Sequence, residues 1–137
     1  DYAAAIRRVA TMPLMVTGGF RSRTGMEAAL AGGDTDVIGL ARPFCTEPDV
    51  ARRLLAREIG TLPAHERHLM LAPGGWRSPA SPLLLMKVIN ILGAQGWYYQ
   101  QMDRLAVGKP PDLGRGVLRS FVRYWWDDLG RALRMRR

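Results

Sequence analysis

The chain has 137 residues and a formal net charge of +8, with 20 Lys and Arg against 12 Asp and Glu. This length supports one modest domain with a real core. The longest apolar run is broken at Lys87, which excludes a membrane-spanning helix of ~20 apolar residues, and no nucleic-acid-binding motif accompanies the basic excess. The single cysteine, Cys45, excludes an internal disulfide and fits a reducing compartment.

The first elements in chain order are a short helix and a strand–helix–strand unit. Apolar residues fall at helical spacing over residues 1–11. Two apolar runs follow, residues 13–17 and residues 36–40, and Thr24 is predicted to cap a helix between them that Gly32 stops. Two buried strands joined by one helix form a βαβ unit, so the strands are predicted to be parallel.

The carboxyl ends of these two strands carry the most informative residues. Parallel strands end at the same edge of a sheet, so Gly18-Gly19 and Ala41-Arg42 are predicted to be neighbours in space. Small residues let backbone N–H groups approach a bound anion, and an arginine side chain adds donors suited to phosphate. Two such loops are typical of the phosphate site that follows the last two strands of a (β/α)8 barrel.

At these residues the sequence resembles a known family. VTGGF followed by DVIGLARPFCTEPDV is similar to the end of the barrel in the old yellow enzymes, the FMN-dependent NADH:flavin oxidoreductases and ene-reductases. The resemblance implies an α/β fold: the last two strands of a (β/α)8 TIM barrel, followed by an α-helical extension. It also implies that Gly18, Gly19, Ala41 and Arg42 hold the FMN phosphate, with the Phe20 backbone a weaker candidate.

The resemblance further implies an FMN-dependent NAD(P)H oxidoreductase. Its substrate would be a small molecule with an activated double bond, reduced by hydride transfer from FMN, with NADH or NADPH as the reductant. A barrel needs ~250 residues, so we interpret the chain as the C-terminal part of a longer, cytoplasmic enzyme. The family's catalytic residues are expected upstream, and none is assigned here. Two alternatives stay open: another phosphate-binding barrel, such as a lyase or isomerase, and a non-catalytic fragment that binds membrane or protein.

The chain is predicted to have two parts: the barrel end, residues 1–60, and an extension, residues 61–137. Pro48 is predicted to start a helix whose buried positions are Val50, Leu54, Leu55 and Ile59. A Pro- and Gly-rich crossing segment follows to residue 82. It contains His65 and His68, whose spacing does not suit a zinc helix, so no metal site is predicted.

Three helices are predicted in the extension. Ser81-Pro82 starts the first, over residues 83–92, Gly93 ends it, and residues 94–107 form the second. The third spans residues 115–134, and the tail from residue 115 holds seven arginines against two aspartates. Its apolar stripe is Leu118, Val122, Trp125, Leu129 and Leu133, broadened by Phe121 and Trp126. We favour packing of this stripe on the barrel or a second subunit, and keep peripheral contact with an anionic membrane as the other hypothesis.

Overall fold

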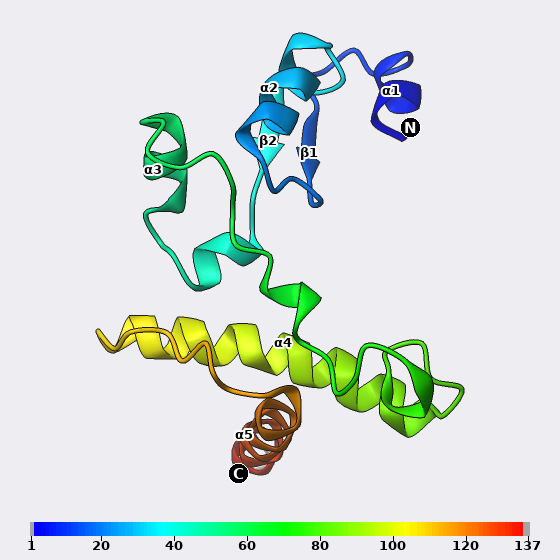
Figure 1. The fold of residues 1–137 in the computed structure, drawn as a ribbon, viewed down its shortest axis with the longest axis vertical. Helices are drawn as coiled ribbons and strands as arrows, with labels where there is room; N and C mark the ends of the chain where they lie inside the picture. The colour runs from blue at the N-terminus through cyan, green and yellow to red at the C-terminus, as the bar shows by residue number, and fades with distance from the viewer. Residues whose placement is uncertain (1, 136–137) are drawn as a thin grey trace. The chain divides into compact units, whose positions relative to one another are not determined.

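The computed structural model describes residues 2–135 and divides the chain into two compact units, residues 1–64 and residues 65–137. We call them the N-terminal unit and the C-terminal unit (Figure 1). The predicted helix start at residue 1 and the last two arginines of the tail lie outside the described residues. No helix within the described range is both long and apolar enough to cross a membrane.

The N-terminal unit is built around the predicted strand–helix–strand arrangement. Its elements are α1 (Tyr2–Arg7), β1 (Met15–Thr17), α2 (Arg23–Ala31), β2 (Val37–Gly39), the 3-10 helix η1 (Arg42–Cys45) and α3 (Val50–Leu55). The two strands pair in parallel, with Met15 opposite Val37 and Thr17 opposite Gly39. The parallel βαβ unit is therefore confirmed. The (β/α)8 barrel stays a prediction.

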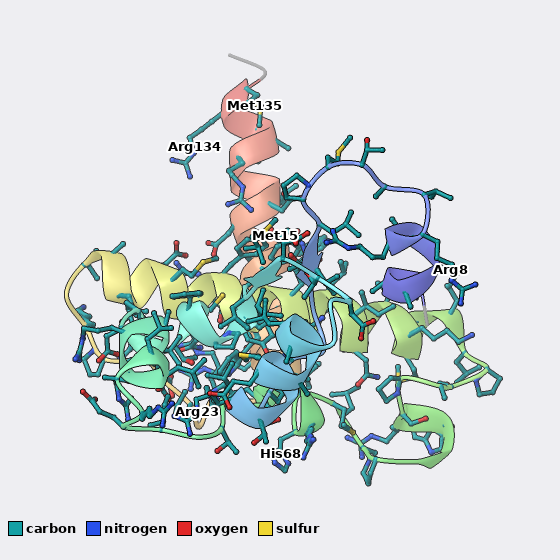
Figure 2. The ribbon with its side chains drawn as sticks, turned by 90° about the horizontal axis from the view of Figure 1, so that it is seen from above. Arg8, Met15, Arg23, His68, Arg134 and Met135 are labelled. Carbon is teal, nitrogen blue, oxygen red and sulfur yellow. The ribbon has the colours of Figure 1, made fainter. Side chains whose placement is uncertain are left out.

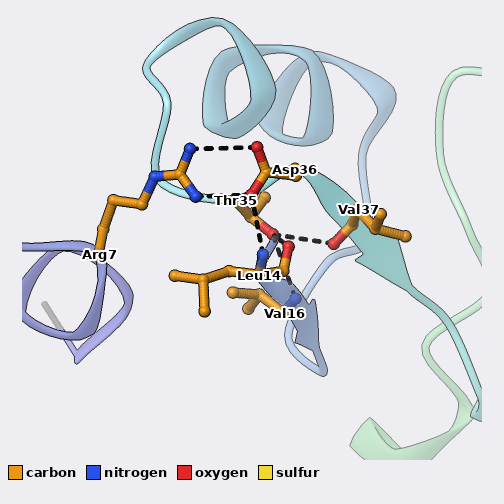
Figure 3. A network of polar contacts seen from close by, with 6 residues as sticks. All are labelled: Arg7, Leu14, Val16, Thr35, Asp36 and Val37. Carbon is orange, nitrogen blue, oxygen red and sulfur yellow. Dashed lines mark hydrogen bonds and ion pairs between the residues drawn. The ribbon is translucent and has the colours of Figure 1, made fainter. Parts of the chain in front are cut away.

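A polar network holds the amino ends of the two strands in register (Figure 3). Asp36 accepts hydrogen bonds from the Arg7 guanidinium at 2.6 and 3.1 Å and from the Leu14 backbone N–H at 2.8 Å. The buried Thr35 hydroxyl accepts from Val16 N at 3.2 Å and lies 2.9 Å from the Leu14 carbonyl oxygen. These bonds join the residues that precede β2 to the start of β1, so they fix how the two strands are aligned.

The hydrophobic core of the N-terminal unit lies between α2 and α3. Its buried members are Met26, Val50, Leu54 and Leu62, and Phe20, Ile38, Leu40 and Ile59 pack against them. The prediction that both strands are buried was wrong, because Met15 and Val37 are 66% and 49% exposed. A two-stranded sheet has two open edges, and α2 alone covers too little of its surface to bury both strands.

Several helix boundaries in this unit differ from prediction, and α1 ends at Arg7, short of the predicted residue 11. Ser22, and not Thr24, caps α2, because Ser22 is extended and its side chain accepts from the Gly25 N–H at 3.2 Å. Helix α3 begins at Val50, two residues after the predicted start at Pro48, and ends at Leu55, short of the predicted Ile59. Arg57 adopts a left-handed conformation with φ of 62°, which turns the chain, and Leu55 is exposed.

The C-terminal unit contains two long helices that cross (Figure 1). They are α4 (Leu84–Ala106) and α5 (Val117–Met135), preceded by the 3-10 helices η2 (His65–Arg67) and η3 (Gly75–Arg77). The predicted break at Gly93 was wrong, since α4 runs through it without interruption. A Cβ on Gly93 would lie 2.6 Å from Val117, and one on Gly96 would lie 2.7 Å from Tyr124 Cβ. These glycines let the two helices approach closely.

Buried polar side chains attach the irregular segments of this unit to α4. Asn90 accepts from the Leu71 N–H at 2.8 Å and donates to the carbonyls of Arg77 and Met86. Gln101 accepts from the Asp112 N–H at 2.7 Å, next to the buried Trp97. The predicted helix start at Ser81-Pro82 was too early, since α4 begins at Leu84. The Ser81 hydroxyl accepts a hydrogen bond from the Leu83 N–H, and this bond closes a turn that precedes the helix.

Candidate functional site

The candidate site is the edge of the sheet at which β1 and β2 end. The last paired residues are Thr17 and Gly39, so the turn after β1 and the segment after β2 leave from the same end of the sheet (Figure 1). The four predicted phosphate contacts, Gly18, Gly19, Ala41 and Arg42, all lie in these two connections and are all exposed. The structure thus places the residues on one edge, as expected from parallel pairing.

Both glycines of the turn after β1 have positive φ angles, which residues with a side chain rarely adopt. Gly18 has φ of 101° and Gly19 has φ of 78°, and a side chain would strain either position. Outside the strand ladder, no backbone hydrogen bond between described residues uses the N–H group of either glycine. The N–H groups of an exposed glycine turn are the kind of donors that bind an anion.

The second connection begins a 3-10 helix with Arg42. Ala41 precedes it with φ of −127° and its carbonyl accepts from the Phe44 N–H at 3.1 Å. Because this φ is negative, alanine fits the position without strain. Pro43 is buried next to the exposed Arg42 and anchors the turn. The arrangement therefore places Arg42 next to the sheet edge on a fixed backbone.

Cys45 lies in the same turn and is a packing residue. Its thiol is half-buried and lies 3.9 Å from the Ala41 carbonyl oxygen, to which it donates. Burial raises the pKa of this thiol, although the positive charge of Arg42 opposes the shift. A raised pKa keeps the sulfur protonated at neutral pH, so Cys45 is a poor nucleophile.

The loop beyond the glycines is held by a distant part of the chain. Ser22 and Thr61 form an antiparallel bridge, and the Leu62 N–H donates to the Arg21 carbonyl at 2.8 Å. The Arg21 guanidinium donates to the Phe20 carbonyl, and Arg23 lies 3.5 Å from Glu27. Both arginines therefore make contacts within their own segment, and the bridge to Thr61 fixes the backbone that follows the glycine turn.

Sequence reasoning missed the pairing of Thr17 with Gly39 at the site edge. A Cβ on Gly39 would collide with the Thr17 side chain, lying 2.9 Å from its Cβ. Glycine is therefore required at position 39 by its neighbour across the sheet. The signal in the sequence is weak, because a glycine at a strand end normally indicates only a turn.

The histidines and carboxylates of the described residues form no metal-binding cluster. Within residues 2–135 no group of three or more His, Cys, Asp and Glu side chains is placed to hold a metal ion. The ring of His65 lies 5.2 Å from the buried Trp97 ring, which gives this histidine a structural contact.

The fold and the sheet edge define part of an α/β protein with a candidate anion site at the carboxyl ends of two parallel strands. The chain is 35% identical over 108 residues to the NADH-dependent flavin oxidoreductase iccE of Talaromyces variabilis, a match that covers 77% of this chain and 25% of that protein. It is 57% identical over 49 residues to the NADH-dependent flavin oxidoreductase iliE of Neonectria sp. (strain DH2), covering 35% of this chain and 6% of that protein.

These matches confirm the family resemblance inferred from the motifs. The chain is related to proteins named NADH-dependent flavin oxidoreductases, which is consistent with a fragment of the old yellow enzyme type. It spans about a quarter of the first relative's length and a smaller share of the second. No protein-family model and no solved structure matches the chain.

Proposed function

We propose that this chain supplies the phosphate-binding end of the FMN site in an NADH-dependent flavin oxidoreductase. The observation that carries the proposal is the sheet edge, where the exposed residues Gly18 and Gly19 and the exposed Arg42 follow the same end of two parallel strands. The relatives' names favour a flavin over the ligand of a phosphate-binding lyase or isomerase.

The residues present fit the phosphate group of FMN. Positive-φ glycines let backbone N–H groups reach phosphate oxygens closely, and a guanidinium contributes charge-assisted hydrogen bonds. When bound, the flavin supplies the hydride chemistry. The role of Gly18, Gly19, Ala41 and Arg42 is to bind its phosphate and so fix the position of the flavin in the enzyme.

The proposed reaction is the reduction of an electron-poor C=C bond in a small molecule, with NADH as the source of the hydride. Groups that bind the substrate carbonyl and supply a proton are expected in parts of the enzyme outside these 137 residues. The proposal assigns positioning and charge to this chain, and no catalytic residue.

The test is the substitution Arg42→Ala in the full-length enzyme. A charge-assisted hydrogen bond contributes roughly 1.5–3 kcal/mol, so the Kd for FMN should rise about ten-fold or more. Arg8→Ala is the matched control, because Arg8 is also exposed but lies beside the end of α1, before β1 begins (Figure 2). Flavin fluorescence on titration measures both constants. An unchanged FMN affinity in Arg42→Ala, with Arg8→Ala also unchanged, would rule out the phosphate site.

A further inference from the structure

The outward face of α5 is a large apolar surface that the C-terminal unit leaves uncovered. Trp125 and Trp126 are 52% and 60% exposed. The other members of this face, all exposed, are Leu118, Val122, Leu129 and Leu133. We call these six residues the α5 apolar face. This face contains the five-residue stripe predicted from the sequence and Trp126, and it does not pack on α4. Phe121, which was predicted to broaden the stripe, lies instead on the side that meets Gly93 of α4.

Helix α5 cannot cover this face by turning it toward α4, because its other side is already used. Val117, Ser120 and Tyr124 meet the glycines of α4, and the Tyr124 ring stacks on Tyr99 with centroids 6.2 Å apart. Gln100 of α4 donates to the Ser120 carbonyl at 2.9 Å. The far end of α5 extends beyond α4, toward Arg134 and Met135 (Figure 2).

The charges around the apolar face are mostly positive. Residues 115–135 contain five arginines against two aspartates, and both aspartates are paired, Asp127 with Arg123 at 2.8 Å and Asp128 with Arg131 at 3.5 Å. Exposed Arg119 makes no ion pair with a described residue. Because residues 119, 122, 123 and 126 are three or four apart, Arg119 and Arg123 border Val122 and Trp126 on the helix surface.

We propose that α5 binds the surface of an anionic membrane, with its apolar face at the boundary between headgroups and acyl chains. An exposed basic helix with tryptophans on its apolar side has the composition of an interfacial helix, and its arginines complement anionic headgroups. A second copy of the chain suits the face less well, since a two-fold interface would bring Arg119 and Arg123 toward the same residues of its partner. The proposal stands independently of the flavin site.

The experiment uses the full-length protein and vesicles of phosphatidylcholine with or without phosphatidylserine. The protein should sediment with the anionic vesicles at low salt and be released at high salt, because exposed charges are screened. The double variant Trp125→Ser/Trp126→Ser should weaken binding about ten-fold or more. Arg119→Gln should weaken it about five-fold, which is the share of one arginine near an anionic surface.

Matched controls lie in the same unit. Trp76 is 61% exposed, close to the value for Trp126, and belongs to η3 outside α5. Trp76→Ser and Lys87→Gln should therefore leave vesicle binding unchanged. Equal losses in the control and α5 variants, a protein that stays in the supernatant at low salt, or a dimer in sedimentation velocity that Trp125→Ser/Trp126→Ser dissolves, would each overturn the proposal.

Discussion

The contact between α4 and α5 can be tested at Gly93 with a single methyl group. Alanine is the better helix former, by about 1 kcal/mol in a helix interior, so Gly93→Ala would stabilise an isolated α4. In the folded unit the new Cβ would lie 2.6 Å from Val117 Cγ1 and 2.6 Å from the Val117 carbonyl oxygen. Carbon atoms pack at about 3.5–4.0 Å, so the helices would have to separate by about 1 Å.

The magnitude follows from these opposing effects. Overpacking of this kind costs about 1–3 kcal/mol, and the upper part of the range applies because the Val117 carbonyl is backbone and cannot rotate away. After the gain in helix propensity, Gly93→Ala should lower the free energy of unfolding by about 1–2 kcal/mol. For a unit of this size the Tm should fall by about 4–16 °C.

Gly130→Ala is the matched control, because it makes the same change inside the neighbouring helix. The nearest atom to a Cβ on Gly130 is the Arg134 Nη2, at 3.8 Å, which is ordinary contact. This variant should raise the free energy of unfolding by up to about 1 kcal/mol. Thermal unfolding followed by circular dichroism gives both shifts, and hydrogen exchange in α4 and α5 peptides assigns them to this unit. A rise in Tm for Gly93→Ala as well would refute the close helix crossing.

Two further predictions concern the sheet. Gly39→Ala should destabilise the N-terminal unit by about 1–3 kcal/mol through collision with Thr17, and Thr17→Ala added to it should recover part of the loss in urea unfolding; no loss in the single variant would contradict the pairing. The pKa of Asp36 is lowered, chiefly by the Leu14 N–H and then by Arg7. The stability that Asp36 contributes is therefore present above its unfolded pKa of about 3.9 and lost as the pH falls through its lower folded pKa. Asp36→Asn should lower the urea midpoint at neutral pH and weaken its decline in acid, whereas an identical acid decline in both proteins would be evidence against the network.

Local patterns in the sequence predicted much of the N-terminal unit. Short apolar runs that end in glycine or Ala-Arg predicted two parallel strands, and the structure confirms them. The Gly32 stop was predicted correctly, and so was the burial of Val50 and Leu54. These features depend on residues a few positions apart, so a periodic pattern and a stop signal are enough to find them. The roles of Gly18, Gly19, Ala41 and Arg42 in binding remain predictions.

Features that depend on distant residues were not predictable in this way. The Arg7–Asp36 pair, the Ser22–Thr61 bridge and the hydrogen bonds of Asn90 join segments that no local pattern relates. The choice of Ser22 over Thr24 as the cap of α2 also follows from that bridge, since it holds Ser22 in the extended conformation that a cap requires.

By itself, the sequence determined that α5 is amphipathic and basic, that two strands are parallel, and that glycines and an arginine follow them at one edge. Only the tertiary structure decided what Gly93 does. In isolation a glycine weakens a helix, which is why it predicted an end there. Against the Val117 backbone, however, it is the absence of a side chain that allows two helices to meet, and the close packing of α5 on this part of α4 keeps the helix continuous.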